Sequence, residues 1–238
     1  MKILSLECSA TPCSAAVIED GKILASDFVN VGLTHSQILM PMAEEVLKKA
    51  NISLKEIDGF AISAGPGSFT GIRIGISAIK GLAAPEKKPC AAVSTLLSMA
   101  YNYIDTDCIV CAVMDARCNQ VYNAIFDIEK GKISRICEDR ALLCEELKEN
   151  LKEISQNTKK CVIIVGDGTK VFSPYVKDIE NVCEPTEDRH YQNAVSVGLA
   201  CEECFKNGEV LSPEEILPVY LRLPQAEREL KLKKENIK

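Results

Sequence analysis

The first half of the chain changes from a strand-like to a helix-like spacing of apolar positions and back. Short apolar runs at residues 3–8, 14–19, 23–29 and 59–64 predict strands, and Asp20-Gly21 predicts a hairpin between the second and third. Helical spacing predicts helices over residues 35–50, 70–84 and 94–103. The apolar face of the first helix is formed by Leu39, Met42, Ala43, Val46, Leu47 and Ala50.

The second half repeats this order. Strands are predicted at residues 109–114, 120–128, 133–137 and 161–165, and helices at 142–154 and 192–207. Asp115 ends the first of these strands as Glu7 ends the first strand of the chain, and residues 129–132 form the matching hairpin. We therefore predict an α/β protein made of a duplicated β-β-β-α-β-α unit. Its two subdomains are predicted at residues 1–103 and 104–238, the second with a charged tail.

The most informative segment joins the fourth predicted strand to the second helix. It reads Ser-Ala-Gly-Pro-Gly-Ser-Phe-Thr-Gly-Ile-Arg-Ile-Gly from Ser63 to Gly75. A glycine inside a helix destabilises it by about 1 kcal/mol relative to alanine. Gly71 and Gly75 therefore indicate that something approaches this helix closely: a phosphate, another backbone or another chain.

Neither of two well-known phosphate loops fits this segment. Gly65, Gly67 and Gly71 are spaced one residue too widely for the dinucleotide motif, and no lysine follows Gly71 as the P-loop requires. A helix N-terminus capped by Ser68 or Thr70 still suits an anion. The alternative is a tight strand-to-helix turn with a closely packed helix.

Composition and charge narrow the function. The chain has 34 acidic and 28 basic residues and a net charge of −6, which argues against sequence-independent nucleic-acid binding without a partner. The first residues are too few and too early charged for a signal peptide, and no apolar run is long enough to span a bilayer. We expect a cytoplasmic protein that does not associate with a membrane.

Twelve cysteines require an explanation, and in a reducing cytosol most are expected to be small apolar core residues. Cys108 and Cys111 lie in a predicted strand, where residues three apart point to opposite faces. Cys201 and Cys204 lie in a predicted helix, where they share a face. Zinc binding or redox pairing stays open for the helical pair, with core or half-exposed thiols as the default.

The duplicated plan is that of the superfamily of actin-like ATPases, Hsp70 and sugar kinases, which has a ribonuclease H-like fold. Short motifs occur in order at residues 3–9 (Ile-Leu-Ser-Leu-Glu-Cys-Ser), 35–39 (His-Ser-Gln-Ile-Leu), 65–75, 93–96 (Val-Ser-Thr-Leu), 115–117 (Asp-Ala-Arg) with Val121-Tyr122, and 218–222 (Pro-Val-Tyr-Leu-Arg). In these motifs the chain resembles the TsaB (YeaZ) family of tRNA threonylcarbamoyladenosine biosynthesis subunits. One departure is Asn119-Gln120, where family members often carry Gly-Glu.

The resemblance implies an accessory, non-catalytic subunit. It implies that the chain pairs with and activates the catalytic paralogue TsaD, and that the ATPase TsaE joins them. The complex transfers a threonylcarbamoyl group to the adenosine next to the anticodon, so tRNA would be contacted only through the complex. A homodimer is expected when the chain is alone.

The resemblance also bears on metal binding. TsaD binds metal through two histidines four residues apart on its first helix, but here Leu39 follows His35 at that spacing. The other histidine is His190, so we expect no metal site.

Two sets of candidate residues follow. The glycine helix would present a stripe of small side chains to the helices of a partner, and the first helix would add an apolar ridge; the alternative is that the stripe faces the chain's own sheet. The predicted partner interface consists of His35, Ile38, Leu39, Met42, Val46, Gly71, Arg73, Gly75, Ala78 and Leu82.

Glu7 and Asp115 lie where the superfamily places acidic residues around nucleotide and metal. No cofactor is expected to be required, but weak ATP or ADP binding at a partner interface stays open. The residues considered for it are Glu7, Ser9, Thr11, Gly65, Gly67, Ser68, Thr70 and Asp115.

Three other functions compete with the accessory role. A stand-alone ATPase or small-molecule kinase needs an aspartate base and two complete phosphate loops, and neither is complete here. A peptidase of the glycoprotease type needs a metal pair or a nucleophile with a base, and Cys8 and Cys13 lack a base. A plain homodimeric binding module is a third alternative. The basic residues of the tail, which could touch RNA or form a solvated helix, are Arg228, Lys231, Lys233, Lys234 and Lys238.

Overall fold

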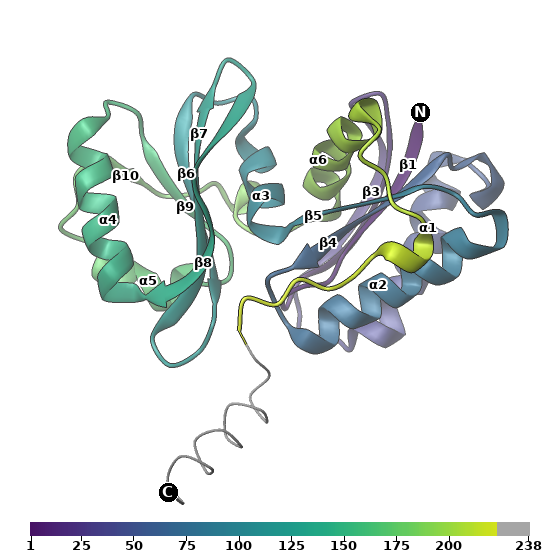
Figure 1. Ribbon diagram of the computed structural model, residues 1–238, viewed down its shortest axis with the longest axis horizontal. Coiled ribbons are helices and arrows are strands. Elements are labelled where there is room, and N and C mark those ends of the chain that lie inside the picture. The colour runs from purple at the N-terminus through teal and green to yellow at the C-terminus, as the bar shows by residue number, and fades with distance from the viewer. Residues whose placement is uncertain (223–238) are drawn as a thin grey trace, which may run out of the picture.

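The computed structural model describes residues 1–222, which form two α/β units with a five-stranded sheet in each (Figure 1). The basic tail residues therefore lie outside the described residues. Each unit has helices on both faces of its sheet, and this confirms the predicted actin-like fold of two related halves.

The first sheet has the strand order β3-β2-β1-β4-β5. The first three strands are antiparallel neighbours, and β4 and β5 run parallel to β1, as the β-β-β-α-β-α unit requires. The strands are β1 (Lys2–Glu7), β2 (Cys13–Glu19), β3 (Lys22–Val29), β4 (Gly59–Gly65) and β5 (Cys90–Ser94).

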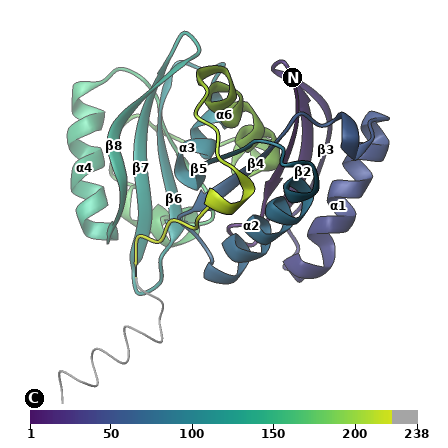
Figure 2. The same ribbon diagram turned by 45° about the vertical axis from the view of Figure 1, so that its right-hand side comes forward.

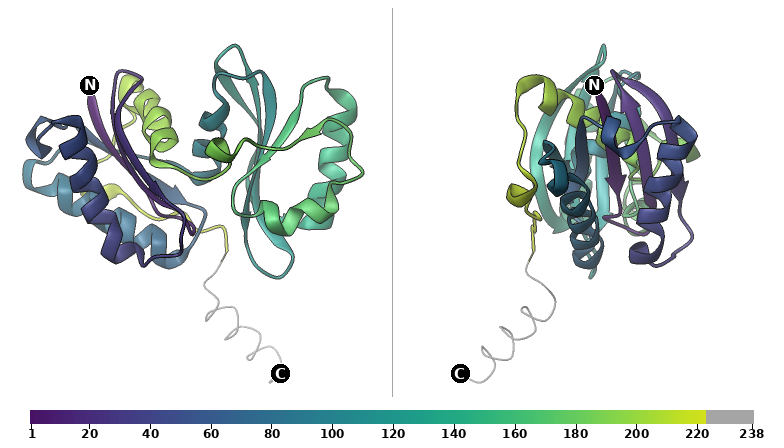
Figure 3. Two further views of the ribbon diagram at one scale, coloured as in Figure 1. Left: turned by 180° about the vertical axis from the view of Figure 1, so that it is seen from behind. Right: turned by 90° about the vertical axis from the view of Figure 1, so that its right-hand side faces the viewer.

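Helices cover the two faces of this sheet unequally. Helices α1 (His35–Ala50) and α2 (Phe69–Ala83) pack on one face, and α6 (Ala194–Asn207) packs on the other (Figure 3). Side chains alternate along a strand, so Leu4 enters the core under α1 and α2, whereas Ile3 packs against α6.

The second sheet repeats the arrangement with the order β10-β9-β6-β7-β8. One face packs on α3 (Thr95–Ala100), and the other packs on α4 (Cys144–Asn157) and α5 (Thr169–Phe172). Its strands are β6 (Cys108–Asp115), β7 (Gln120–Glu129), β8 (Lys132–Leu143), β9 (Val162–Val165) and β10 (Val182–Cys183). Cys108 and Cys111 enter opposite cores of this sheet, as predicted.

Both predicted hairpins are two-residue turns with positive φ angles. Asp20 and Gly21 have φ of 49° and 78°, and Lys130 and Gly131 have 51° and 76°. This backbone suits the twist of the flanking strands, which is why Asx-Gly and similar pairs signal hairpins. The matching turns confirm the duplication of the unit.

The predicted boundary at residue 103 does not coincide with the packing of the two units. Helix α3 lies before that boundary but packs on the second sheet, and α6 lies after it but packs on the first. The first unit therefore consists of residues 1–94 and 194–220, and the second of residues 95–193, against which Leu221 and Arg222, the last described residues, also pack. A linear boundary fails because each half contributes a helix to the unit built mainly by the other.

Two strands of the second sheet differ from the prediction. Strand β8 extends to Leu143, whereas the prediction ends at residue 137. The charged residues that follow continue the strand because it lies at the edge of the sheet, where side chains are exposed at alternate positions. Its register against β7 is also shifted. Strand β10 has two residues, too few to give a periodic signal. Cys183 on β10 is disulfide-bonded to Cys161, with 6.0 Å between their Cα atoms, so this pair departs from the expected free thiols.

No helix among residues 1–222 is long and apolar enough to cross a bilayer.

Candidate functional site

The glycine-rich segment is a tight turn that is bonded to the neighbouring β1–β2 loop. Gly65 and Gly67 have φ of 123° and 158°, and the peptide between Gly65 and Pro66 is cis. Ser68 caps α2, because its Oγ accepts a hydrogen bond from Gly71 N at 3.3 Å. Ser68 N donates to Ser9 O at 2.6 Å, so the turn lies directly against the loop that follows β1.

The glycines of α2 face the interior of the first unit. A Cβ atom at Gly71 would collide with the carbonyl oxygen of Cys8, and one at Gly75 would lie 2.8 Å from Cys8 Sγ and 2.9 Å from Ile62 Cδ1. The hypothesis that Gly71 and Gly75 face a partner is therefore wrong. The close approach that they permit is that of Cys8, which directly follows β1, and of Ile62 on β4.

The proposed apolar ridge of α1 also belongs to the chain's own core. Leu39, Met42 and Val46 are 1%, 6% and 0% exposed and pack with the buried side of α2. Their predicted outward position is wrong for the same reason as that of the glycines: the most regular apolar stripe of a surface helix covers its own sheet.

Other residues of the predicted interface reach the surface. Arg73 is exposed, and His35, Ile38, Ala78 and Leu82 are half-buried. The structure adds Met40, which is 43% exposed, and the neighbouring Phe69 and Ile74 of α2. The sequence signal for Met40 was its apolar character outside the buried stripe of α1.

A groove with a volume of about 620 Å³ runs between the outer sides of α1 and α2. Leu39 and Met40 of α1 line one side of the groove. On α2, the short side chains of Ser77 and Ala78 leave space above the helix. The lining residues are Ser36, Leu39, Met40, Phe69, Thr70, Arg73, Ile74, Ser77 and Ala78.

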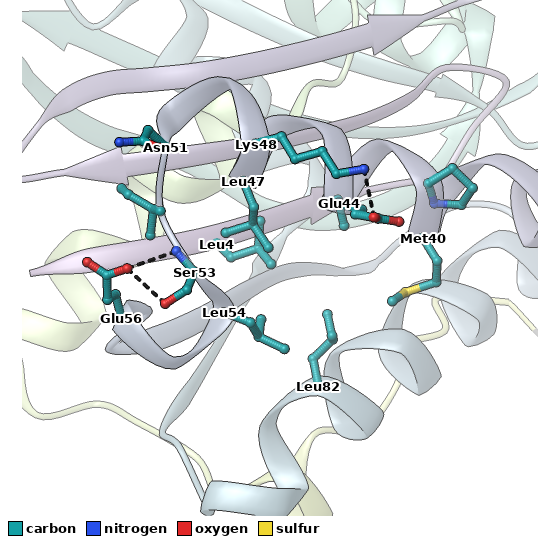
Figure 4. A pocket seen from close by; sticks show the side chains of 13 residues that line it. Leu4, Met40, Glu44, Leu47, Lys48, Asn51, Ser53, Leu54, Glu56 and Leu82 are labelled. Atoms are coloured by element: carbon teal, nitrogen blue, oxygen red, sulfur yellow. Dashed lines mark hydrogen bonds and ion pairs between the residues drawn. The ribbon is translucent and has the colours of Figure 1, made fainter.

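A second hollow, of about 940 Å³, continues on the other side of Met40 (Figure 4). Leu47, Leu54 and Leu82 supply apolar walls, and the ion pair of Glu44 and Lys48 at 2.7 Å lies at its side. The two hollows make the outer face of α1 and α2 a broad, mostly apolar surface.

The C-terminal strap, residues 208–222, holds one end of this surface in place. Tyr220 stacks on Phe69 with 4.3 Å between ring centroids, and its hydroxyl accepts a hydrogen bond from Arg73 Nε at 2.8 Å. Val219 N donates to Ala64 O at 2.8 Å, and Ile216 is fully buried in the core under α1 and α2. The strap explains why the motif at residues 218–222 accompanies the glycine segment.

The first group of nucleotide candidates is already bonded within the chain. Ser9 N donates to Glu7 Oε1 at 2.5 Å, and Ser68 N donates to Ser9 O. Burial raises the pKa of Glu7. Gly67 lies against the carbonyl of Ser9. These backbone donors are not free for a phosphate, so the residues present do not fit a phosphate cradle.

The remaining nucleotide candidates are separated. Thr11 O accepts a hydrogen bond from His35 Nε2 at 3.2 Å, and Thr70 is exposed on α2. Asp115 lies at the end of β6 in the second unit, where Oδ1 accepts a hydrogen bond from Arg117 N at 2.7 Å. Among the nucleotide candidates, the structure therefore brings together Glu7, Ser9 and Ser68. Asp115 lies at a different loop.

The two histidines lie in different settings. His35 contacts the β1–β2 loop, whereas His190 Nε2 shares a hydrogen bond of 2.8 Å with Thr169 Oγ1 and has a pKa lowered by burial. Among residues 1–222, no group of three or more His, Cys, Asp or Glu side chains is arranged to hold a metal ion.

Comparison with known proteins identifies the family. The family model described as "TsaD: tRNA N6-adenosine threonylcarbamoyltransferase" matches residues 30–230. The tRNA threonylcarbamoyladenosine biosynthesis protein TsaB of Escherichia coli is 32% identical over 225 residues, which cover 93% of this chain and 95% of that protein. TsaB of Bacillus subtilis is 26% identical over 227 residues, which cover 95% of this chain and 96% of that protein.

Solved structures agree with the sequence comparison. YeaZ from Pseudomonas aeruginosa superimposes with a TM-score of 0.78 at 27% identity, covering 92% of this chain and 99% of that one. A ROK hexokinase from Thermus thermophilus, at 10% identity and a TM-score of 0.51, shares the fold alone. The matching motifs, the duplicated fold and these relatives place the chain in the TsaB (YeaZ) family of tRNA threonylcarbamoyladenosine biosynthesis proteins.

Proposed function

We propose that this chain is an accessory subunit that pairs with the catalytic paralogue TsaD, together with the ATPase TsaE, in threonylcarbamoyladenosine synthesis on tRNA. The main observation in support of this pairing is the apolar outer face of α1 and α2, with its groove of about 620 Å³. Met40 is 43% exposed on this face, and an apolar side chain so placed is typical of a protein interface.

The shape of this face suits two helices of a partner. Ser77 and Ala78 leave room for a partner's side chains, and the Tyr220–Phe69 stack holds the end of the groove in one conformation. A TsaD-type protein of Treponema denticola is 32% identical over 124 residues, 45% of this chain, so a TsaD paralogue carries related elements. A partner with an equivalent helix pair would complete a four-helix contact, and a second copy would do so when the chain is alone.

Pairing is tested by Ala78→Arg, which places a long cation in the groove. We expect binding to TsaD, measured by titration calorimetry, to weaken by at least about tenfold, since a buried unpaired charge costs several kcal/mol. Met40→Arg, at a more exposed position, should act in the same direction. Gln156→Arg on the exposed side of α4 is the matched control and should leave binding unchanged.

The assigned role is tested in the same preparations. Threonylcarbamoyl transfer to tRNA should require TsaD and TsaE in addition to this chain, and Ala78→Arg should reduce it in parallel with pairing. Transfer by the isolated chain, or undiminished pairing of both groove variants with circular dichroism spectra like that of the wild type, would overturn the proposal.

Nucleotide binding by the chain alone is not part of this proposal, because the donors around Ser9 are already used. The weak ATP or ADP binding considered from the sequence stays a prediction for the assembled complex. Calorimetric titration of ATP into the isolated chain and into the complex distinguishes the two cases.

A further inference from the structure

The four outer strands of the two sheets are protected to different degrees. Free strand edges attract other strands, and proteins protect them by short length, charges, bulges or a covering segment. Strand β10 has two residues, and β5 is bridged at Cys90 by Leu211 of the strap. Strand β8 is long, but it carries five charged residues and irregular register.

Strand β3 lacks most of these protections. It has eight residues and forms the outer strand of the first sheet (Figure 2). It carries the exposed apolar side chains Ile23, Leu24 and Phe28. Its register is irregular only near its start, and residues 25–29 pair regularly with β2. Within residues 1–222, the outward backbone groups of this regular part bond to no other segment.

A hollow of about 830 Å³ flanks the same strand on the α6 side of the sheet. Phe28 and Ile23 lie opposite Ser14 and Ile18, so they share the face on which Ile18 packs against α6. Val195 and Leu199 of α6 continue the apolar lining. This hollow lies on the face of the sheet opposite α1 and α2, away from the surface proposed for TsaD.

The charges around the hollow are mostly negative. Its lining contains the carboxylates of Asp105, Glu187 and Asp188 but only one cation, Arg189. The carboxylate of Asp27 points to the opposite face of the sheet, where it lies 3.9 Å from Lys49 Nζ of α1. Arg189 forms two hydrogen bonds with Asp105, at 2.6 and 2.9 Å, and is 4.0 Å from Asp188. Arg189 is thus shared between Asp105 and Asp188, and one cation does not neutralise the three carboxylates of Asp105, Glu187 and Asp188, so the rim attracts a further cation.

The same charges argue against two other occupants. A second copy paired edge to edge would bring identical carboxylates together, and a nucleic acid would bring phosphates to them. A ligand that pairs with the free edge of β3 needs an extended backbone. Apolar side chains at alternate positions of this ligand would fill the hollow. Lysine or arginine side chains would lie beside the carboxylates of the rim.

We propose that the β3 edge binds an extended, cationic segment of a partner protein, which adds to the first sheet as a sixth strand. Apolar side chains of this segment enter the hollow beside Phe28, Val195 and Leu199. Its lysine or arginine side chains lie beside Glu187 and Asp188.

The probe is a short synthetic peptide of alternating lysine and valine, titrated into the full chain and followed by fluorescence anisotropy. We expect it to bind about tenfold more tightly, or better, than a peptide of alternating glutamate and valine. Amide hydrogen exchange should slow at residues 25–29 when the cationic peptide is bound, and it should not slow on β8.

Matched variants locate the site. Phe28→Lys adds an edge charge and should weaken peptide binding by about tenfold or more; Ile136→Lys on the β8 edge is the control, because Phe28 and Ile136 are both 45% exposed. The double variant Glu187→Lys with Asp188→Lys lies outside the sheet and should shift the preference toward the anionic peptide. It tests the rim even if Phe28→Lys fails to fold.

Four results would overturn the proposal. They are unchanged binding to Phe28→Lys, equal binding of the anionic peptide or of tRNA, protection confined to another segment, and self-association that Phe28→Lys abolishes. The last result would assign the edge to a second copy. Because TsaD pairing is measured at α1 and α2, its failure would leave this test unaffected.

Discussion

At the residue scale, the glycines of α2 determine how closely the helix approaches the first sheet. Gly71 lies against the backbone of Cys8, and Gly75 lies against the side chains of Cys8 and Ile62. Their spacing correctly indicated a close approach. It could not identify the approaching group, because a glycine is needed both when a partner's helix comes close and when the chain's own backbone at Cys8 comes close.

Alanine substitutions test this packing. Gly75→Ala should lower the free energy of unfolding by about 1–3 kcal/mol through overpacking, and Gly71→Ala by at least as much, because it meets a backbone atom. Gly81→Ala in the same helix has nothing within 4 Å of the added Cβ and should raise stability by up to about 1 kcal/mol. Urea unfolding measures all three, and equal effects at Gly75 and Gly81 would contradict the assignment.

Glu7 offers a second test at this scale, through pH. Its pKa is raised in the folded protein by burial, so the folded state holds the proton more tightly than the unfolded state. The stability contribution of this residue is present below its unfolded pKa and declines as pH rises toward the folded pKa. Each unit of difference between the two pKa values corresponds to about 1.4 kcal/mol.

Glu7→Gln removes this titration while keeping an oxygen that can accept the hydrogen bond from Ser9 N. Relative to the wild type, the variant should therefore gain stability between pH 5 and pH 8. Urea unfolding of both proteins at the two pH values gives the comparison. A constant difference would show that Glu7 does not titrate in this range.

At the element scale, α2 shows why periodicity predicted a helix but not its orientation. Ile72, Ile76 and Ile79 face the core, while Ile74 and Leu82 lie on the outer side, so the helix is apolar on both faces. Its position and capping residue follow from local sequence. Which apolar face lies inward depends on the shape of the sheet, and only contacts with β1 and β4 decide it.

At the scale of the whole molecule, each unit depends on a helix contributed from the other half of the chain. Val197 and Cys201 of α6 complete the core behind β1 and β4, although they lie 94 and 98 residues beyond the predicted boundary at 103. Crossings of this kind leave no local signal, because α6 has the ordinary pattern of a surface helix.

The consequence is that residues 1–103 should not fold as an independent unit. Without α6 and the strap, the apolar α6-facing side of the first sheet is exposed to water. Circular dichroism and thermal melting of this fragment should show no cooperative transition, whereas a fragment of residues 95–193, which retains every element of the second sheet, should melt cooperatively. A cooperative transition of the fragment of residues 1–103 would contradict this division.

The sequence by itself determined most of the strands, the hairpins, the duplication and the family, because these depend on local periodicity, turn chemistry and motifs that occur in order. It also located the segment on which the site depends. Only the tertiary structure decided that Gly71, Gly75, Leu39, Met42 and Val46 face inward. It also showed that the donors around Ser9 are already occupied and that β3 ends the sheet as an unprotected strand. These facts depend on which surfaces meet, and contacts between distant segments are not encoded in the period of any one of them.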